Sequence, residues 1–222
     1  WYNKLKTVLE ADGYVANPYD LCLFNKSENG VQITVAFHVD DLLVTCESEK
    51  LMDSLEAHLK GAFSSITVAS GNRHSYLAMN IVTGDTGIEV DMTAYIEKCV
   101  GEKVFRRAAS SPARDDLFEE PEDSERLGVD DSAHFHSDTA KLLYLAKRTR
   151  VECLCAVSHL SSRVSAPTTD DQGKLDRVIN YLAHTKERKM VMEWGGRVSM
   201  EAFIDASFGC HMDCKSRSGI ML

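Results

Sequence analysis

The sequence contains no long apolar run. Crossing a bilayer takes about 20 consecutive apolar residues, and no stretch of this chain has that character. The charged start, short apolar stretch and small-residue cleavage site of a secretory signal are missing as well. These absences exclude an obvious membrane anchor, and we expect no membrane partner.

Regularly spaced cysteines are also missing, although the chain has seven Cys. An odd number without regular spacing argues against a disulfide framework and for a reducing compartment. Cys210, His211 and Cys214 come closest to a metal-binding spacing. A structural zinc site needs a second ligand pair of similar form. No such pair is evident, and we expect no zinc.

An excess of basic residues, typical of nucleic-acid proteins, is lacking, because the net charge is -9. The segment from Asp115 to Asp138 alone holds ten acids against the single base Arg126, which accounts for all of this charge. An acidic loop can be held away from a nucleic-acid groove. Bulk charge therefore neither excludes nor supports nucleic acid as a partner.

The chain has 222 residues, enough for one large domain or two small ones, and 44% hydrophobic residues, as in globular proteins. It starts with Trp1 instead of Met, and it stops at Leu222 within an apolar run. We therefore expect both ends to lie inside a longer polypeptide.

The first half alternates short strand and helix patterns. Apolar spacing predicts a helix over Lys4–Leu9, and alternation predicts strands on either side of an Asn29-Gly30 turn. The expected elements are strands at Leu21–Phe24, Val31–Phe37 and Leu42–Val44, a helix capped by Ser48 with the stripe Leu51, Met52, Leu55 and Leu59 and an end at Gly61, a hairpin of Tyr76–Val82 and Ile88–Val90 around Gly84–Gly87, and a helix at Ala94–Val104.

The second half is mainly helical. Pro112, Pro121 and the acidic run predict a mobile linker over residues 106–137. Apolar patches around Leu142 and Leu160 predict helices, and Thr169–Gln172 predicts a capping box before a stripe of Leu175, Val178, Ile179 and Leu182. Met190 and Met192 are expected in the core. A last strand is expected from Ser199 to Ile204.

Asp40 and Asp41 form the most informative motif, because two adjacent acids interrupt two apolar strand runs. The flanks favour burial, so the acids are expected at the rim of a buried hairpin. Oxygen ligands of this kind suit a hard divalent cation such as magnesium. The pair alone leaves open a plain surface turn in which Asp tolerates a tight backbone.

The residues around this pair resemble those of copia-type retrotransposon reverse transcriptases. The run Phe37-His38-Val39-Asp40-Asp41-Leu42-Leu43 is similar to the family's Y-V-D-D-L-L box. Further motifs follow in the family's order, namely Asp20–Phe24 before the box, Tyr76–Ile81, Ala94–Lys98, Leu142–Ala146 with Thr149-Arg150, Ala156–Ser161, Tyr181–Lys186, and Asp205–Gly209 with Lys215–Gly219. The likeness covers nearly the whole chain except the acidic segment.

The resemblance implies a fold and a division of the chain. The fold would be α+β, with an antiparallel palm sheet backed by helices, a helical thumb or connection, and the start of a mixed RNase H-like sheet. The corresponding ranges are 1–105 for the palm, 106–137 for the acidic linker, 138–198 for the thumb and 199–222 for RNase H.

The resemblance also implies an RNA-directed DNA polymerase with RNase H, and roles for single residues. Asp40 and Asp41 would bind Mg²⁺, or Mn²⁺ in its place, beside the phosphates of a dNTP, with His38 and Val39 next to the substrate. Asp205 would be a metal ligand of RNase H. The implied partners are an RNA template, a DNA primer and the rest of the Pol polyprotein, in a cytoplasmic retrotransposon particle or in the nucleus.

Three departures and one gap qualify this expectation. His38 stands where the family has Tyr, Val151-Glu152 replaces Pro-Asp, and Ser207 replaces an acid. In this family the palm's third carboxylate comes from an earlier strand, upstream of Trp1, and RNase H uses acids beyond Leu222. We therefore expect the chain alone to polymerise nothing and cut nothing.

Lys147, Arg148 and Arg150 follow an apolar helix patch and could track a template backbone. A solvated helix end, favoured by the helix dipole, explains them equally well. Two alternatives for the whole chain stay open: a decayed or domesticated non-catalytic fragment acting as a scaffold or binding piece, and a different palm enzyme such as a nucleotidyl cyclase. The second alternative predicts none of the motifs after the hairpin.

Overall fold

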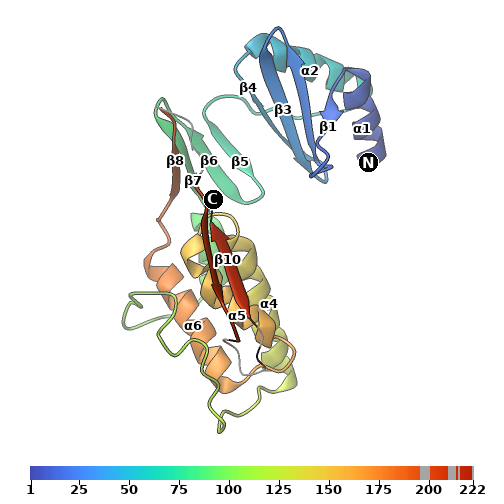
Figure 1. The fold of residues 1–222 in the computed structure, drawn as a ribbon. Helices are drawn as coiled ribbons and strands as arrows, with labels where there is room; N and C mark the ends of the chain where they lie inside the picture. Colours follow the sequence, from blue (N-terminus) through green and yellow to red (C-terminus); the bar gives the residue numbers. More distant parts are fainter. Residues whose placement is uncertain (196–200, 210–213, 215, 222) are drawn as a thin grey trace. The chain divides into compact units, whose positions relative to one another are not determined.

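The computed structural model describes residues 1–195, 201–209, 214 and 216–221, and its chain divides into two compact units. Unit 1 is Trp1–Leu77 and unit 2 is Ala78–Leu222. Both combine helices with antiparallel strands (Figure 1), which confirms the expected α+β class. In the described part of the chain, no helix is both long and apolar enough to span a membrane.

Unit 1 is a four-stranded antiparallel sheet with two helices. The strands lie in the order β1-β2-β3-β4. The elements are α1 (Tyr2–Ala11), β1 (Val15–Ala16), β2 (Leu23–Glu28), β3 (Val31–His38), β4 (Asp41–Cys46), α2 (Glu49–Ala62) and β5 (Arg73–Tyr76).

One face of this sheet is buried and the other is open. Ile33, Val35 and Phe37 alternate along β3 and are almost fully buried. They share a core with Leu5 and Leu9 of α1 and with Leu55 and Leu59 of α2. Because side chains of a strand alternate between its faces, the residues between them, including His38, belong to the face away from this core.

Turn and cap chemistry in unit 1 follows the sequence closely. Asn29 and Gly30 have φ of 52° and 82°, the left-handed backbone that a two-residue hairpin turn requires. Ser48 caps α2 by accepting a hydrogen bond from the Leu51 N–H. Two details differ: α2 continues through Gly61 to Ala62, and Met52 is 37% exposed instead of buried.

The strand predicted over Tyr76–Val82 is wrong as one element. Leu77 and Ala78 have φ of 50° and 64°, which ends β5 at Tyr76 and starts β6 at Met79. Residues with a Cβ rarely adopt this left-handed backbone conformation. The apolar run Leu77-Ala78-Met79 therefore gives no sign in the sequence that the strand is interrupted.

Unit 2 contains most of the helices. A bundle of α3, α4, α5 and α6 encloses one apolar core, which includes the predicted stripe Leu175, Val178, Ile179 and Leu182. Its elements are β6 (Met79–Thr83), β7 (Gly87–Asp91), α3 (Thr93–Val100), α4 (Val129–Ala146), the short 3₁₀ helix η1 (Val151–Cys153), α5 (Leu154–Arg163), α6 (Thr169–His184), β8 (Met190–Glu193), β9 (Phe203–Ser207) and β10 (Arg217–Met221).

The strands of unit 2 pair antiparallel, β6 with β7, β7 with β8, and β9 with β10. β8 lies within the range expected to be helical, and Met192 on it is 46% exposed. The expectation that Met192 is a core residue is therefore wrong. Ser199 lies outside the described residues, and the last strand pair begins at Phe203.

The acidic segment is not a mobile linker over its predicted range of 106–137. Helix α4 already begins at Val129, and its Phe135 is fully buried. Ahead of the helix, Ala109 and Leu117 are buried in the helical core, with 8% and 5% of their surfaces exposed. Buried apolar side chains before and among the acids hold the segment against the core, and the run of charges gave no sign of them.

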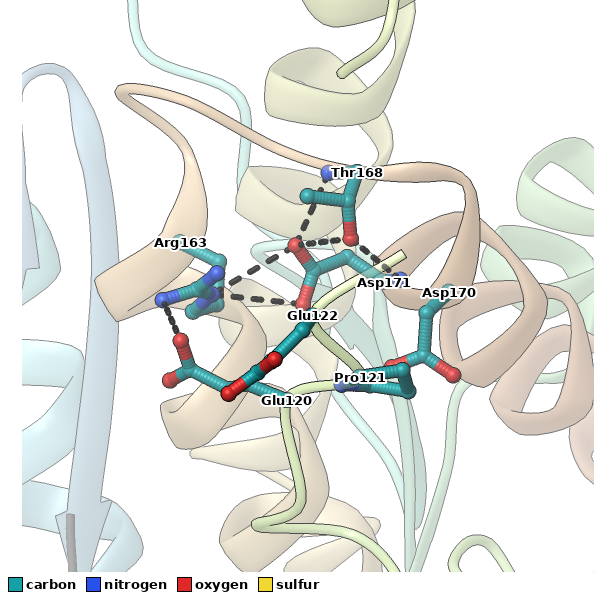
Figure 2. A pocket seen from close by; sticks show the side chains of 7 residues that line it. All are labelled: Glu120, Pro121, Glu122, Arg163, Thr168, Asp170 and Asp171. Atoms are coloured by element: carbon teal, nitrogen blue, oxygen red, sulfur yellow. Dashed lines mark hydrogen bonds and ion pairs between the residues drawn. The ribbon is translucent and has the colours of Figure 1, made fainter. Parts of the chain in front are cut away.

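Backbone and charged contacts also attach this segment to the start of α6 (Figure 2). Thr169 N–H donates to the Glu125 carbonyl (2.8 Å), and Arg163 pairs with Glu120 (2.9 Å) and Asp171 (3.3 Å). Thr168 and Asp171 form a capping box, one residue earlier than predicted. These side chains, with Pro121, Glu122 and Asp170, line a cavity of 240 Å³.

Arg150 is a buried connector in the same unit. Only 1% of its surface is exposed, and its guanidinium donates to Glu152 Oε1 (2.8 Å), the Thr185 carbonyl (3.1 Å) and Thr185 Oγ1 (2.6 Å). The guanidinium also lies over the Tyr181 ring, 5.5 Å from its centroid. Arg150 thus joins η1 to the C-terminal end of α6.

Replacing Leu117 tests whether the acidic segment is part of the fold. We expect Leu117→Ala to lower the free energy of unfolding by about 2–4 kcal/mol, the usual cost of removing a buried Leu side chain. Urea unfolding followed by circular dichroism measures this loss. Asp123→Ala, an exposed change in the same segment, is the control. Equal stability of the two variants would restore the linker interpretation.

Replacing Arg150 tests its structural role. We expect Arg150→Met to lower the free energy of unfolding by about 3 kcal/mol, because hydrogen bonds to a charged group contribute about 1.5–3 kcal/mol each. Arg150→Lys should recover little of this, since an ammonium lacks the planar fork. Lys147→Met, at an exposed neighbour, should leave the urea midpoint unchanged. A stable Arg150→Met protein would contradict this role.

Candidate functional site

The paired acids lie at the tip of the β3–β4 hairpin. His38 pairs with Asp41 at the last step of the ladder, and Val39 and Asp40 form the turn between the two strands. This is the strand, tight turn and strand arrangement that the sequence predicts. The ladder from Ile33–Cys46 to His38–Asp41 fixes where the two carboxylates leave the sheet.

Val39 gives this turn an unusual backbone, with φ of 55°. A β-branched residue in this region is a steric outlier, and such a conformation costs about 1–3 kcal/mol. The turn therefore keeps a strained conformation at the point where the acids stand. Backbone strain of this kind is concentrated at functional sites, and the sequence gives no sign of it.

The four residues of the tip, His38, Val39, Asp40 and Asp41, are all exposed. Beyond them, Leu42 and Val44 of β4 pack against the core of unit 1. Alternation then places Asp41 on the opposite, open face, together with His38 on β3. Asp40 occupies the turn itself, so the two carboxylates leave the backbone at neighbouring points on an accessible edge.

These two carboxylates supply the hard oxygen ligands that magnesium prefers, and one or two of them commonly suffice together with substrate phosphates. Among the described residues, no group of three or more His, Cys, Asp or Glu side chains could hold a metal ion. The acid pair therefore offers oxygen atoms of the kind that magnesium takes, but from two side chains only.

A feature that the sequence interpretation missed lies at the same end of the sheet. The loop between β1 and β2 reaches the end of β3, because the Phe37 N–H donates to the Cys22 carbonyl (3.0 Å). The sequence signal for this loop was its three turn-forming residues, Asn17, Pro18 and Asp20. The strand predicted from Leu21 begins two residues later, at Leu23.

The remaining predicted site residues lie in unit 2. Asp205 is an exposed residue in the middle of β9, paired with Gly219 of β10. Lys147 is exposed, whereas the Arg148 guanidinium stacks on Tyr144, 3.4 Å from the ring centroid. Arg150 is engaged inside the fold, so its guanidinium is not presented to a phosphate. The structure does not gather these cations into one surface.

Burial suppresses the ionisation of two of the cysteines. Burial raises the pKa of Cys153 to about 12 and that of Cys99 to about 11, so both thiols stay protonated at neutral pH. Cys210 and His211 lie outside the described residues.

Sequence comparison with known proteins identifies a family for the first half of the chain. Residues 1–110 match the family described as reverse transcriptase (RNA-dependent DNA polymerase). Two retrovirus-related Pol polyproteins of Arabidopsis thaliana, from transposons RE1 and RE2, are 25% and 26% identical over 96% of this chain. A putative transposon Ty5-1 protein of Saccharomyces cerevisiae is 25% identical over 99% of this chain and 71% of its own length.

The chain spans 14% of the length of each of the two polyproteins. No solved structure gives a significant match. The paired acids and their hairpin fall inside the matched family region, and the likeness to the transposon proteins continues through unit 2. Residues 1–110 therefore belong to the reverse transcriptase family, and the chain as a whole is related to Pol polyproteins of copia-type retrotransposons.

Proposed function

We propose that this chain is part of an RNA-directed DNA polymerase from the Pol polyprotein of a copia-type retrotransposon. The observation that carries the proposal is the acid pair at the tip of a strained, accessible hairpin, within the region that matches the reverse transcriptase family. The substrates would be dNTPs, a DNA primer and an RNA template. The parent protein would act in a cytoplasmic particle or in the nucleus.

Asp40 and Asp41 would hold magnesium, or manganese in its place, beside the triphosphate of the incoming nucleotide. The ion would neutralise the negative charge that develops on the transferred phosphoryl group. The hairpin ladder fixes the backbone from which the two side chains leave, so both would start close to the same bound ion. His38 and Val39, exposed beside them, would contact the primer end or the nucleotide.

The chain alone would not perform this reaction. Two carboxylates without a third ligand from an earlier strand do not organise an in-line displacement, and the described residues contain no metal-binding group of three. The remainder of the Pol polyprotein would supply the missing ligand. We assign residues 1–105 to the palm, 138–198 to the thumb and 199–222 to RNase H, with Asp205 as its first metal ligand.

Primer extension tests this proposal in a polymerase that joins this chain to the preceding part of its Pol protein. We expect Asp40→Asn and Asp41→Asn each to lower magnesium-dependent extension on a primed RNA template by about 100-fold or more, because loss of metal stabilisation costs several kcal/mol. Asp53→Asn, at an exposed acid of α2, is the matched control and should keep full activity.

Two results would contradict the proposal. One is extension by the longer protein that is unchanged in Asp40→Asn. The other is magnesium-dependent extension by the 222-residue chain alone, which would contradict the part of the proposal that requires a third metal ligand from outside the chain. An intact longer protein that binds a primed template and never extends it would favour the non-catalytic scaffold instead.

A further inference from the structure

The loop between β1 and β2 presents an unusual surface. Five consecutive residues from Pro18 to Cys22 are exposed. Among them Tyr19 is 97% exposed and Leu21 is 59% exposed. Isolated exposed apolar residues are ordinary on protein surfaces. Tyr19 and Leu21 lie only two residues apart on one short loop, and this makes the loop a candidate contact surface.

This loop is held in one conformation by its own hydrogen bonds. Asn17 Oδ1 accepts from the Tyr19 N–H (2.8 Å) and the Asp20 N–H (3.3 Å), and Asp20 Oδ1 accepts from the Cys22 N–H (2.9 Å). The Asn17 N–H closes the loop by donating to the Leu23 carbonyl (2.8 Å). A backbone fixed in this way presents the Tyr19 ring with little entropy left to lose on binding.

The loop stands beside the acid pair because of the sheet register. β2 begins where β3 ends, with Leu23 opposite Ala36, and the Cys22–Phe37 hydrogen bond extends this pairing toward the turn. Neighbouring strands lie about 4.8 Å apart, so the loop and the Val39–Asp40 turn are neighbours at one edge. Val39, in that turn, is 66% exposed and adds a third exposed apolar side chain to this edge.

Charge indicates which part of a nucleic acid fits here. Asp20, Asp40 and Asp41 all lie at this edge, which disfavours phosphate except where a cation intervenes. An exposed aromatic ring, in contrast, suits the flat face of a base or the apolar face of a sugar, and stacking on such rings is a common mode of nucleic-acid binding.

We propose that the Pro18–Cys22 loop is a nucleic-acid contact surface, on which the Tyr19 ring packs against a nucleotide of the primer–template next to the Asp40–Asp41 tip. This inference rests on the proposed polymerase function and adds to it a binding residue outside the acid box. The hydroxyl of Tyr19 is not needed for such a contact, whereas the ring is.

Photocrosslinking tests the contact with the 222-residue chain. A DNA primer carrying 5-iodouracil at its 3′-terminal nucleotide is annealed to an RNA template and irradiated with the protein in magnesium chloride. We expect a crosslink that maps to Tyr19 by mass spectrometry. It should persist in Tyr19→Phe and disappear in Tyr19→Ala. Ser27→Ala, exposed near the other end of β2, is the matched control and should crosslink like the parent chain.

Fluorescence anisotropy with the same duplex gives a second readout. We expect Tyr19→Ala to raise the dissociation constant about tenfold, since loss of one base stack costs about 1–3 kcal/mol, with Tyr19→Phe within about twofold of the parent. Because Tyr19 is exposed, thermal unfolding of all variants should coincide.

The outcomes separate this inference from the polymerase proposal. Crosslinking elsewhere on the chain, with unchanged affinity in Tyr19→Ala, overturns the loop contact and leaves the acid pair's role standing. No binding and no crosslink by the parent chain overturns the contact too. Loss of extension in Asp40→Asn in the longer polymerase, measured separately, decides the role of the acids.

Discussion

The alternating apolar strip of β3 is the constraint on which the candidate site depends. Ile33, Val35 and Phe37 are buried against both helices of unit 1. A slip of one residue in the pairing of β3 would turn this strip to solvent. Burying a large apolar side chain stabilises the fold by roughly 2 kcal/mol, and the loss of this stabilisation for the whole strip fixes the register. That register places His38 opposite Asp41 and leaves Val39 and Asp40 in the turn.

The same strip explains why so much of this region could be predicted from the sequence. Period-two alternation, the Asn29-Gly30 turn and the Ser48 cap are local signals, and each states a backbone preference directly. Together these signals suffice to predict the hairpin and the position of the acids at its tip. The strain at Val39 could not be predicted in this way. A valine normally avoids positive φ, and the surrounding ladder imposes it.

Unit 2 shows where sequence signals are ambiguous. The prolines and the acidic run predicted a mobile linker over residues 106–137, yet long-range contacts decide the structure there. Leu117 is buried in the helical core, and the Lys174 ammonium donates to the Glu119 carbonyl, 55 residues earlier (2.6 Å). The charges of this segment stay largely at the surface, so solvation and anchoring are compatible. Composition predicts that the charges are solvated, but it does not predict that the segment is anchored to the core.

Arg150 illustrates the opposite error, in which a charged residue is assigned to solvent because of its type. Its guanidinium is buried because Glu152, Thr185 and the Tyr181 ring satisfy it together, and Thr185 lies 35 residues away along the chain. A cluster of basic residues in the sequence therefore does not by itself define a basic surface on the protein.

The tip of unit 1 says more about a possible ligand than that basic cluster does. There, a strained turn, two carboxylates and a rigid aromatic loop meet at one edge of a sheet. The carboxylates favour a hard cation and the aromatic ring favours a base or sugar. A nucleotide offers a base and a sugar that suit the ring, and a phosphate group whose oxygens bind the same hard cation that the carboxylates favour.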